Sequence, residues 1–458
     1  MAIRRLVALA AAAFLSSFLF SLAVVQATSG MITETRKTIL VRRLGDLQLD
    51  GYGAFHPFRI SSAVPYYDES ATVASLLTLE TLNALDMVDV DSAVLYLSYR
   101  QHPRTGGFGT YVLSDDTILP AELFVTSQVI HTLKEIEALS KINQTALKDF
   151  VLSRYNQSLG AFSEPIVVGA NGRKYAISPF PLGFRTYLDL VAYAIPNVIS
   201  TFSAVSILAD IDALNLINVT KTLDFIMSTR ASNGVFKPYP TAKQENLPGW
   251  SSLLTNPFDV DSYGTGIPYT YAAIGALESL GRLDVLDQSD KEQITEYVLS
   301  CLGQNGDFII HKDWSDAESC YTFYAVMTLN YLGTLSQAEQ AISKVQNHIL
   351  ETQQLSTGNQ WPLPLPKGDI AFSEGTLYGV FDDRGGDALF DTMRAVRVLN
   401  ITGSLSLLDQ TTPRSMAVLG NMILISALVT FSVIIASWSF TKLKERKDVN
   451  TPQKNDSH

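Results

Sequence analysis

The chain has 458 residues, of which 47% are hydrophobic and 17% are charged, and its formal net charge is -11. This length allows one large core or two ordinary ones, and the hydrophobic fraction is high for a protein that meets only water. The negative charge, without a basic stripe in the middle of the chain, excludes nucleic acid as a partner.

The first 29 residues predict an export signal. Arg4 and Arg5 precede an apolar run over 6–25, and small residues around Ala27 offer a cleavage site. The run is long for a signal core, so an uncleaved N-terminal anchor stays open as a second interpretation.

A short motif, glycine followed by an aromatic residue, recurs through the middle of the chain. Its aromatic residues are Phe55, Phe108, Phe162, Phe236, Phe308 and Trp361. The intervals of roughly 50 to 75 residues suit a repeated unit of two helices. Glycine fits the positive-φ position at which a helix ends and turns, and the aromatic residue then fills the gap between helices. We interpret these motifs as architecture rather than chemistry.

Helical periodicity fills the intervals between the motifs. The segments 68–86, 89–99 and 290–302 have helical spacing and begin with polar capping residues. The segments 269–281 and 320–333 are apolar and aromatic on several faces, as expected of helices between an outer layer and a cavity. Since strand patterns are absent, we expect an all-α fold. About six helix pairs with apolar inner helices favour closure into a double ring around an apolar pocket.

The C-terminal region predicts a membrane anchor. The segment 416–438 is apolar and long enough to cross a bilayer at about 1.5 Å per residue. Basic residues from Lys442 to Lys447 follow it, so the tail 439–458 is expected in the cytoplasm and the helical domain on the other side of the membrane. Residues 409–415 would then form a short tether.

The chain has only two cysteines, Cys301 and Cys320. An exported domain could join them in a disulfide, because the intervening loop returns one helix end towards the next, and such a bond is worth about 3 kcal/mol. Two inert buried thiols are the other interpretation that the residues leave open.

These motifs resemble those of the protein prenyltransferase β-subunits and their terpene cyclase relatives. The segment "YVLSCLGQNGDF", which ends at Phe308, is similar to the family's pattern of a helix followed by Gln-x-x-Gly-Phe. The resemblance covers residues 35–408 and implies an α/α toroid of six helix pairs, which is a fold that serves more than one activity.

The resemblance also implies a metal site and a diphosphate site. Glu318, Cys320 and Asp391 fall on the family's zinc-binding Asp, Cys and His. A cysteine and two carboxylates could still hold a divalent metal such as zinc. Lys312 and Arg384 are the cations expected to face a prenyl diphosphate, whose leaving group carries concentrated negative charge.

The function predicted from the resemblance is binding of an isoprenoid or another apolar ligand, with prenyl transfer as the implied activity. Two alternatives stay open. One is a non-catalytic binding or assembly module, with or without a protein partner subunit. The other is an extracytoplasmic carbohydrate-active (α/α)6 enzyme, whose two carboxylates would be Asp382 with Asp383 or Glu318 with Asp391.

Overall fold

A computed structural model describes residues 35–56, 69–109, 111–112, 118–119, 121–168, 174–176, 196–240, 266–310, 319–353 and 388–410. Contacts divide the chain into two compact units, Leu40–Leu407 and the pair of end segments Met1–Ile39 and Leu408–His458. The first unit contains the candidate binding site and is described by itself.

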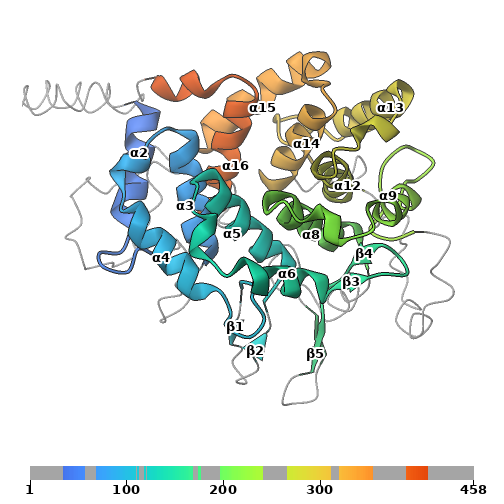
Figure 1. Cartoon of the computed structure of the whole chain (residues 1–458). Helices are drawn as coiled ribbons and strands as arrows, with labels where there is room; N and C mark the ends of the chain where they lie inside the picture. Colours follow the sequence, from blue (N-terminus) through green and yellow to red (C-terminus); the bar gives the residue numbers. More distant parts are fainter. Residues whose placement is uncertain are drawn as a thin grey trace, which may run out of the picture. The chain divides into compact units, whose positions relative to one another are not determined.

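Six inner helices of the first unit form a closed ring. They are α3 (Glu69–Thr81), α5 (Leu123–Glu135), α8 (Val198–Asp210), α12 (Ile267–Ser279), α14 (Ser319–Tyr331) and α16 (Ala388–Ile401) (Figure 1). Each packs against the next in this order, and α16 packs against α3. The row of helices therefore closes upon itself, as the sequence predicts.

Each inner helix is preceded in the chain by another helix. These outer helices are α2 (Arg36–Leu47), α4 (Val90–Arg100), α6 (Gln144–Leu152), α9 (Val219–Ser228), α13 (Gln288–Ser300) and α15 (Glu339–Thr352). Within the ring unit α4 packs on α3, α6 on α8, α9 on α12 and α13 on α14. The expected α/α toroid of helix pairs is confirmed for the part of the chain that the structure describes.

The inner helices share one register. Each contains a threonine and, thirteen residues later, a leucine that begins a short 3-10 helix. The pairs are Thr72 and Leu85, Thr126 and Leu139, Thr201 and Leu214, Thr270 and Leu283, Thr322 and Leu335, and Thr392 and Leu405. The 3-10 helices are η1 (Leu85–Met87), η2 (Leu139–Lys141), η3 (Leu214–Leu216), η5 (Leu283–Val285), η6 (Leu335–Ala338) and η8 (Leu405–Asp409). The repeat is therefore more regular than the glycine-aromatic motif alone indicates.

The glycine-aromatic motifs link each outer helix to the following inner helix. Their glycines have positive φ, and Gly160 shows why no side chain is tolerated, since an added Cβ would lie 2.4 Å from the backbone of Lys221. The aromatic residue two places later is fully buried, and its N–H donates to the register threonine of the following helix. The pairs are Phe55 with Thr72, Phe108 with Thr126, Phe162 with Thr201, Phe236 with Thr270, and Phe308 with Thr322. The predicted packing role is confirmed for these five motifs, and the sixth aromatic residue, Trp361, lies outside the described residues.

The domain is mostly helical, as expected, with a few short strands in its loops. The loops that the structure describes contain three antiparallel hairpins, which pair β1 (Tyr111–Val112) with β2 (Ile118–Leu119), β3 (Tyr155–Asn156) with β4 (Ala161–Phe162), and β5 (Ile166–Val168) with β6 (Lys174–Ala176). Strands of two or three residues are too short to show an alternating pattern in a sequence.

Among the residues whose placement is described, no helix is both long enough and apolar enough to span a bilayer. The predicted signal at 1–29 and the predicted membrane helix at 416–438 lie outside those residues, so both stay predictions.

Candidate binding site inside the helix ring

Asp391 is the one predicted metal ligand whose side chain is described. It lies near the start of α16, is buried, and its Oδ1 accepts a hydrogen bond from Arg394 Nη1 at 3.2 Å. Glu318, Lys312 and Arg384 lie outside the described residues. In the described part of the chain no three His, Cys, Asp or Glu side chains are grouped to hold a metal ion, so the predicted metal and diphosphate sites stay predictions.

The two cysteines lie at successive helix ends. Cys301 is fully buried at the C-terminal end of α13, and Cys320 is the second residue of α14. The side chain of Cys320 is not described, so the disulfide and the metal-ligand interpretations both stay predictions. Because α14 packs against α16, Cys320 and Asp391 begin neighbouring helices at the same end of the ring.

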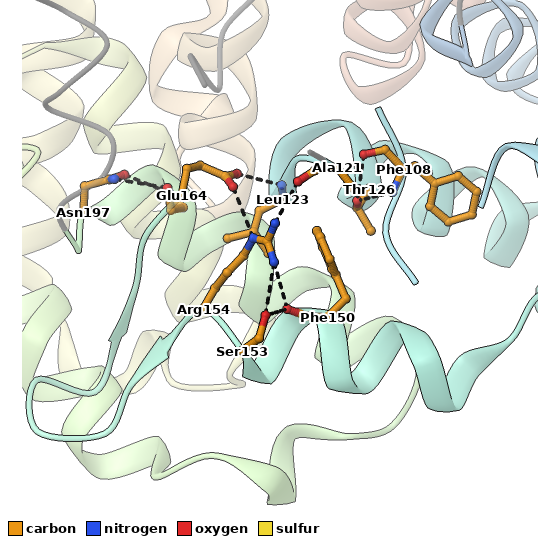
Figure 2. Close-up of polar contacts among 10 residues, drawn as sticks. Phe108, Ala121, Leu123, Thr126, Phe150, Ser153, Arg154, Glu164 and Asn197 are labelled. Atoms are coloured by element: carbon orange, nitrogen blue, oxygen red, sulfur yellow. Dashed lines mark hydrogen bonds and ion pairs between the residues drawn. The ribbon is translucent and has the colours of Figure 1, made fainter. Parts of the chain in front are cut away.

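At that end of the ring, Glu164 and Arg154 form a buried ion pair that the sequence did not indicate (Figure 2). Glu164 Oε2 lies 3.4 Å from Arg154 Nε, and its Oε1 accepts from the N–H of Leu123, the first residue of α5, at 2.6 Å. Arg154 Nη2 donates to the carbonyl of Ala121 at 2.8 Å, and the guanidinium lies 3.8 Å from the ring centroid of Phe150. The pair thus joins the loop after β4 to the start of α5 and the end of α6.

In two later repeats a backbone carbonyl takes the place of the Glu164 carboxylate. The first N–H of α8, from Val198, donates to the carbonyl of Pro238, and the first N–H of α12, from Ile267, donates to the carbonyl of Ile310. Pro238, Ile310 and Glu164 each lie two residues after a buried phenylalanine. Glu164 therefore replaces a neutral carbonyl with a carboxylate, and a negative charge at a helix N-terminus is favourable.

Burial raises the pKa of Glu164 from 4.5 to about 7, although Arg154 and the N–H of Leu123 favour the ionised form. Because the folded state then holds a proton that the unfolded state releases, this group's contribution to stability falls as the pH rises from about 4.5 to 7. Over that window we expect the free energy of unfolding of the native chain to fall, relative to Glu164→Gln, by up to about 3 kcal/mol. Urea unfolding at several pH values measures this difference.

The control for this experiment is Asp284→Asn, since Asp284 forms an exposed ion pair with Arg282. Exposed pairs contribute little, so this variant should follow the native pH profile. A pH-independent difference between the native chain and Glu164→Gln would contradict the assignment of the titration to Glu164.

The inner helices turn three sets of positions towards the interior of the ring: one, five and nine residues after the register threonine. Many of these side chains keep some accessible surface, whereas the positions three, four, six and seven residues after the threonine are buried. The partly accessible ones include Ser127, Phe202, Tyr271, His131, Ser206, Arg397, Asp210, Ser279 and Tyr331. Side chains that lie deep in the unit and still retain accessible surface are those expected at the wall of a pocket.

An aromatic group covers one side of this interior face. We define the Tyr271 group as Phe202, Tyr271, Phe323, Tyr324 and Tyr331, from α8, α12 and α14. The Tyr271 ring stacks on Tyr324 at 4.7 Å between centroids and meets Phe202 edge-on at 5.3 Å. Gly275 makes room for Phe202, because an added Cβ would lie 2.6 Å from that ring. Such faces bind apolar or π-rich ligands.

Burial raises the pKa of Tyr271 well above its usual range, and Tyr331 adds to this effect while Arg397 opposes it. Burial likewise raises the pKa of Tyr331, whose ring stacks on that of Tyr271 with 6.3 Å between centroids. Both hydroxyls therefore stay protonated and act as neutral hydrogen-bonding groups.

A polar cluster lies towards the C-terminal ends of the inner helices. His131 Nε2 is 3.3 Å from Arg397 Nη2, and His131 Nδ1 is 3.6 Å from Asp210 Oδ2. Asp210 also accepts from Lys134 Nζ at 2.8 Å. Burial disfavours the charge on Asp210, but the contacts with His131 and Lys134 outweigh it and lower its pKa. Asp210 is thus an anion held by two partners.

Neither the Tyr271 group nor the polar cluster was among the predicted site residues. The signal that could have found them is the common register of the six inner helices, since His131 and Arg397 both lie five residues after the threonine. The contact between them depends on ring closure, which a helical pattern does not specify.

The chain belongs to the prenyltransferase alpha-alpha toroid domain family. The family model matches residues 55–179, 110–248 and 256–360, which together span more than half of the chain. The resemblance drawn from the sequence motifs is therefore confirmed.

Solved structures give distant similarities to the same kind of fold. A variant of the type II terpene cyclase MstE from Scytonema, in complex with its substrate geranylgeranyl dihydroxybenzoate, is 16% identical, with a TM-score of 0.49, over 81% of this chain and 97% of that one. Candida albicans protein geranylgeranyltransferase-I complexed with GGPP is 13% identical, with a TM-score of 0.46, over 78% of this chain and 91% of that one. No curated protein matches in sequence.

Proposed function

We propose that the interior of the helix ring binds an isoprenoid or another long apolar chain. The observation that carries this proposal is the Tyr271 group, which sets aromatic side chains from three successive inner helices on the interior face of a closed ring. Membership of the prenyltransferase toroid family supports the choice of an isoprenoid.

Tyr271→Ala tests the proposal directly. Removing the central ring deletes its stacking and its apolar contact area, so the dissociation constant for farnesol, a C15 isoprenoid alcohol, should rise about tenfold or more. Equilibrium binding of radiolabelled farnesol to the full chain, held in amphipol, measures this effect.

The matched control is Tyr99→Ala, because Tyr99 lies on the outer helix α4 and is 79% exposed. It should leave farnesol binding unchanged. Equal affinities for the native chain and Tyr271→Ala, or equal losses in both variants, would contradict binding at the Tyr271 group.

Prenyl transfer and metal binding are proposed as further properties of the same ring. Glu318, Cys320 and Asp391 would hold zinc, which lowers the pKa of a bound thiol, and Lys312 and Arg384 would face the diphosphate. What supports the set is the position of Cys320 and Asp391 at the starts of the neighbouring helices α14 and α16.

Metal analysis and thiol titration of the purified chain test the zinc set. About one equivalent of zinc that is lost in Asp391→Ala, together with two titratable thiols, is the expected result. An intact disulfide without zinc would leave a binding module that performs no metal-assisted transfer.

We also propose that the ring lies outside the cytoplasm and is held at a membrane by residues 416–438. The apolar segment and the basic residues after it support this orientation. Protease treatment of sealed vesicles should remove the tail and spare the ring when the cytoplasmic face points outward, and the reverse pattern would refute the orientation.

A further inference from the structure

Arg397 reaches across the interior of the ring. It belongs to α16, but its guanidinium contacts His131 on α5, and α3 lies between these two helices in the ring order. A side chain that joins the two neighbours of α3 has to cross the inner face of that helix. Arg397 is also half-buried, so its charge is placed inside the ring rather than on its outer surface.

The charge of Arg397 is not matched by a carboxylate of the described residues. Five other arginines in that part of the chain each form an ion pair with an Asp or Glu: Arg100, Arg154, Arg230, Arg282 and Arg394. Asp210 and Glu135 lie 3.6 and 3.9 Å from His131 Nδ1, and Asp210 also accepts from Lys134. A partly buried cation without an anionic partner is costly unless a ligand supplies one.

His131 holds the guanidinium in place without neutralising it. Because arginine only donates, a hydrogen bond between these two atoms uses the Nε2 atom of His131 as acceptor and directs the Nδ1 atom at Asp210. One N–H group of Arg397 is used in this contact. The other donors of the planar fork match the geometry of a carboxylate or a phosphate.

The Tyr271 group lies within the electrostatic reach of the same guanidinium. Tyr331 lies on α14, which packs against α16, the helix of Arg397, and Arg397 favours the ionised forms of both Tyr271 and Tyr331. An aromatic wall and an oriented cation therefore meet inside the ring. An amphiphile with an apolar chain and one acidic end satisfies both.

We propose that Arg397 binds the acidic head group, a carboxylate or a phosphate, of an apolar ligand whose chain lies along the Tyr271 group. This inference rests on the proposed function and specifies the class of ligand. The anionic head group neutralises the charge of Arg397, and His131 is a positioning residue that orients the guanidinium.

Three probes with the same C15 chain test the proposal on the full chain in amphipol: farnesol, farnesoic acid and farnesyl monophosphate. A charged hydrogen bond to Arg397 should make at least one acid bind about tenfold or more tightly than the alcohol. The two acids differ only in head group, so their order assigns the carboxylate or the phosphate. Arg397→Gln should reduce the better acid to the affinity of farnesol and leave farnesol binding unchanged.

The control is Arg282→Gln, which removes an arginine that is 39% exposed and paired with Asp284; it should alter none of the three affinities. Equal binding of acids and alcohol to the native chain would overturn this inference while leaving the proposed function intact. An equal loss of affinity for all three probes in Arg397→Gln would overturn this inference as well. Failure of every probe to bind the native chain would instead overturn the proposed function. If Arg397→Gln does not fold, the affinities of the native chain for the two acids and for the alcohol still test the inference.

Discussion

Arg154→Met is expected to lower the free energy of unfolding by about 3–5 kcal/mol at pH 9, where Glu164, whose pKa is about 7, is ionised in the native chain. The substitution leaves the Glu164 carboxylate buried without its cation and removes the donor to the carbonyl of Ala121. Methionine has a similar length and is apolar, so the change in packing is small. Chemical denaturation monitored by circular dichroism measures the loss.

Two comparisons separate this explanation from a general packing defect. The loss should shrink at pH 5, because protonation of Glu164 removes the unpaired charge, and it should shrink in the double variant Arg154→Met with Glu164→Gln. Arg282→Met, at an exposed ion pair, should cost less than about 1 kcal/mol. A loss that is the same at pH 5 and pH 9 would show that the ion pair is not the cause.

Phe162→Ala is the second substitution with a large expected effect, a loss of about 3–5 kcal/mol. Phe162 is fully buried, and its ring centroid lies 4.8 Å from that of Tyr155. Its backbone N–H donates a hydrogen bond to Thr201 Oγ1. Truncation leaves a cavity between helices whose backbones are fixed by the ring, so collapse around it is limited. Thermal and urea unfolding of the variant measure the loss.

The matched control for Phe162 is Leu95→Ala. Leu95 lies on the outer face of α4 and is 54% exposed, so its truncation should change stability by less than about 0.5 kcal/mol. Similar losses in both variants would show that the buried phenylalanine of the glycine-aromatic motif does not hold the helix pair together.

The sequence predicts the repeat because its physical causes are local. A glycine with positive φ at Gly160 and a buried ring at Phe162 recur in the other loops, and both requirements arise within a few residues. The apolar inner helices α12 and α14 are likewise predicted, since their aromatic residues occupy several faces.

The contacts that form the candidate site could not be predicted in the same way, because they join residues far apart in the chain. His131 and Arg397 are 266 residues apart and meet only after α16 has packed against α3. The role of Glu164 could not be predicted either, because the segment "AFSEP" does not indicate that its carboxylate replaces a backbone carbonyl used by later repeats. The positions of these side chains depend on both the helix register and the closure of the ring, and the local sequence pattern predicts only the register.

The proposed binding site forms only if the ring closes between α3 and α16. Nitroxides attached through an unnatural keto amino acid at Glu80 and Asn400, which lie eight residues after Thr72 and Thr392, leave both cysteines untouched. Packed helices have axes about 8–10 Å apart, so electron–electron dipolar spectroscopy should give a spin–spin distance of about 10–20 Å. An open row of six inner helices would separate the two labels by about 40 Å or more and would contradict a closed ring.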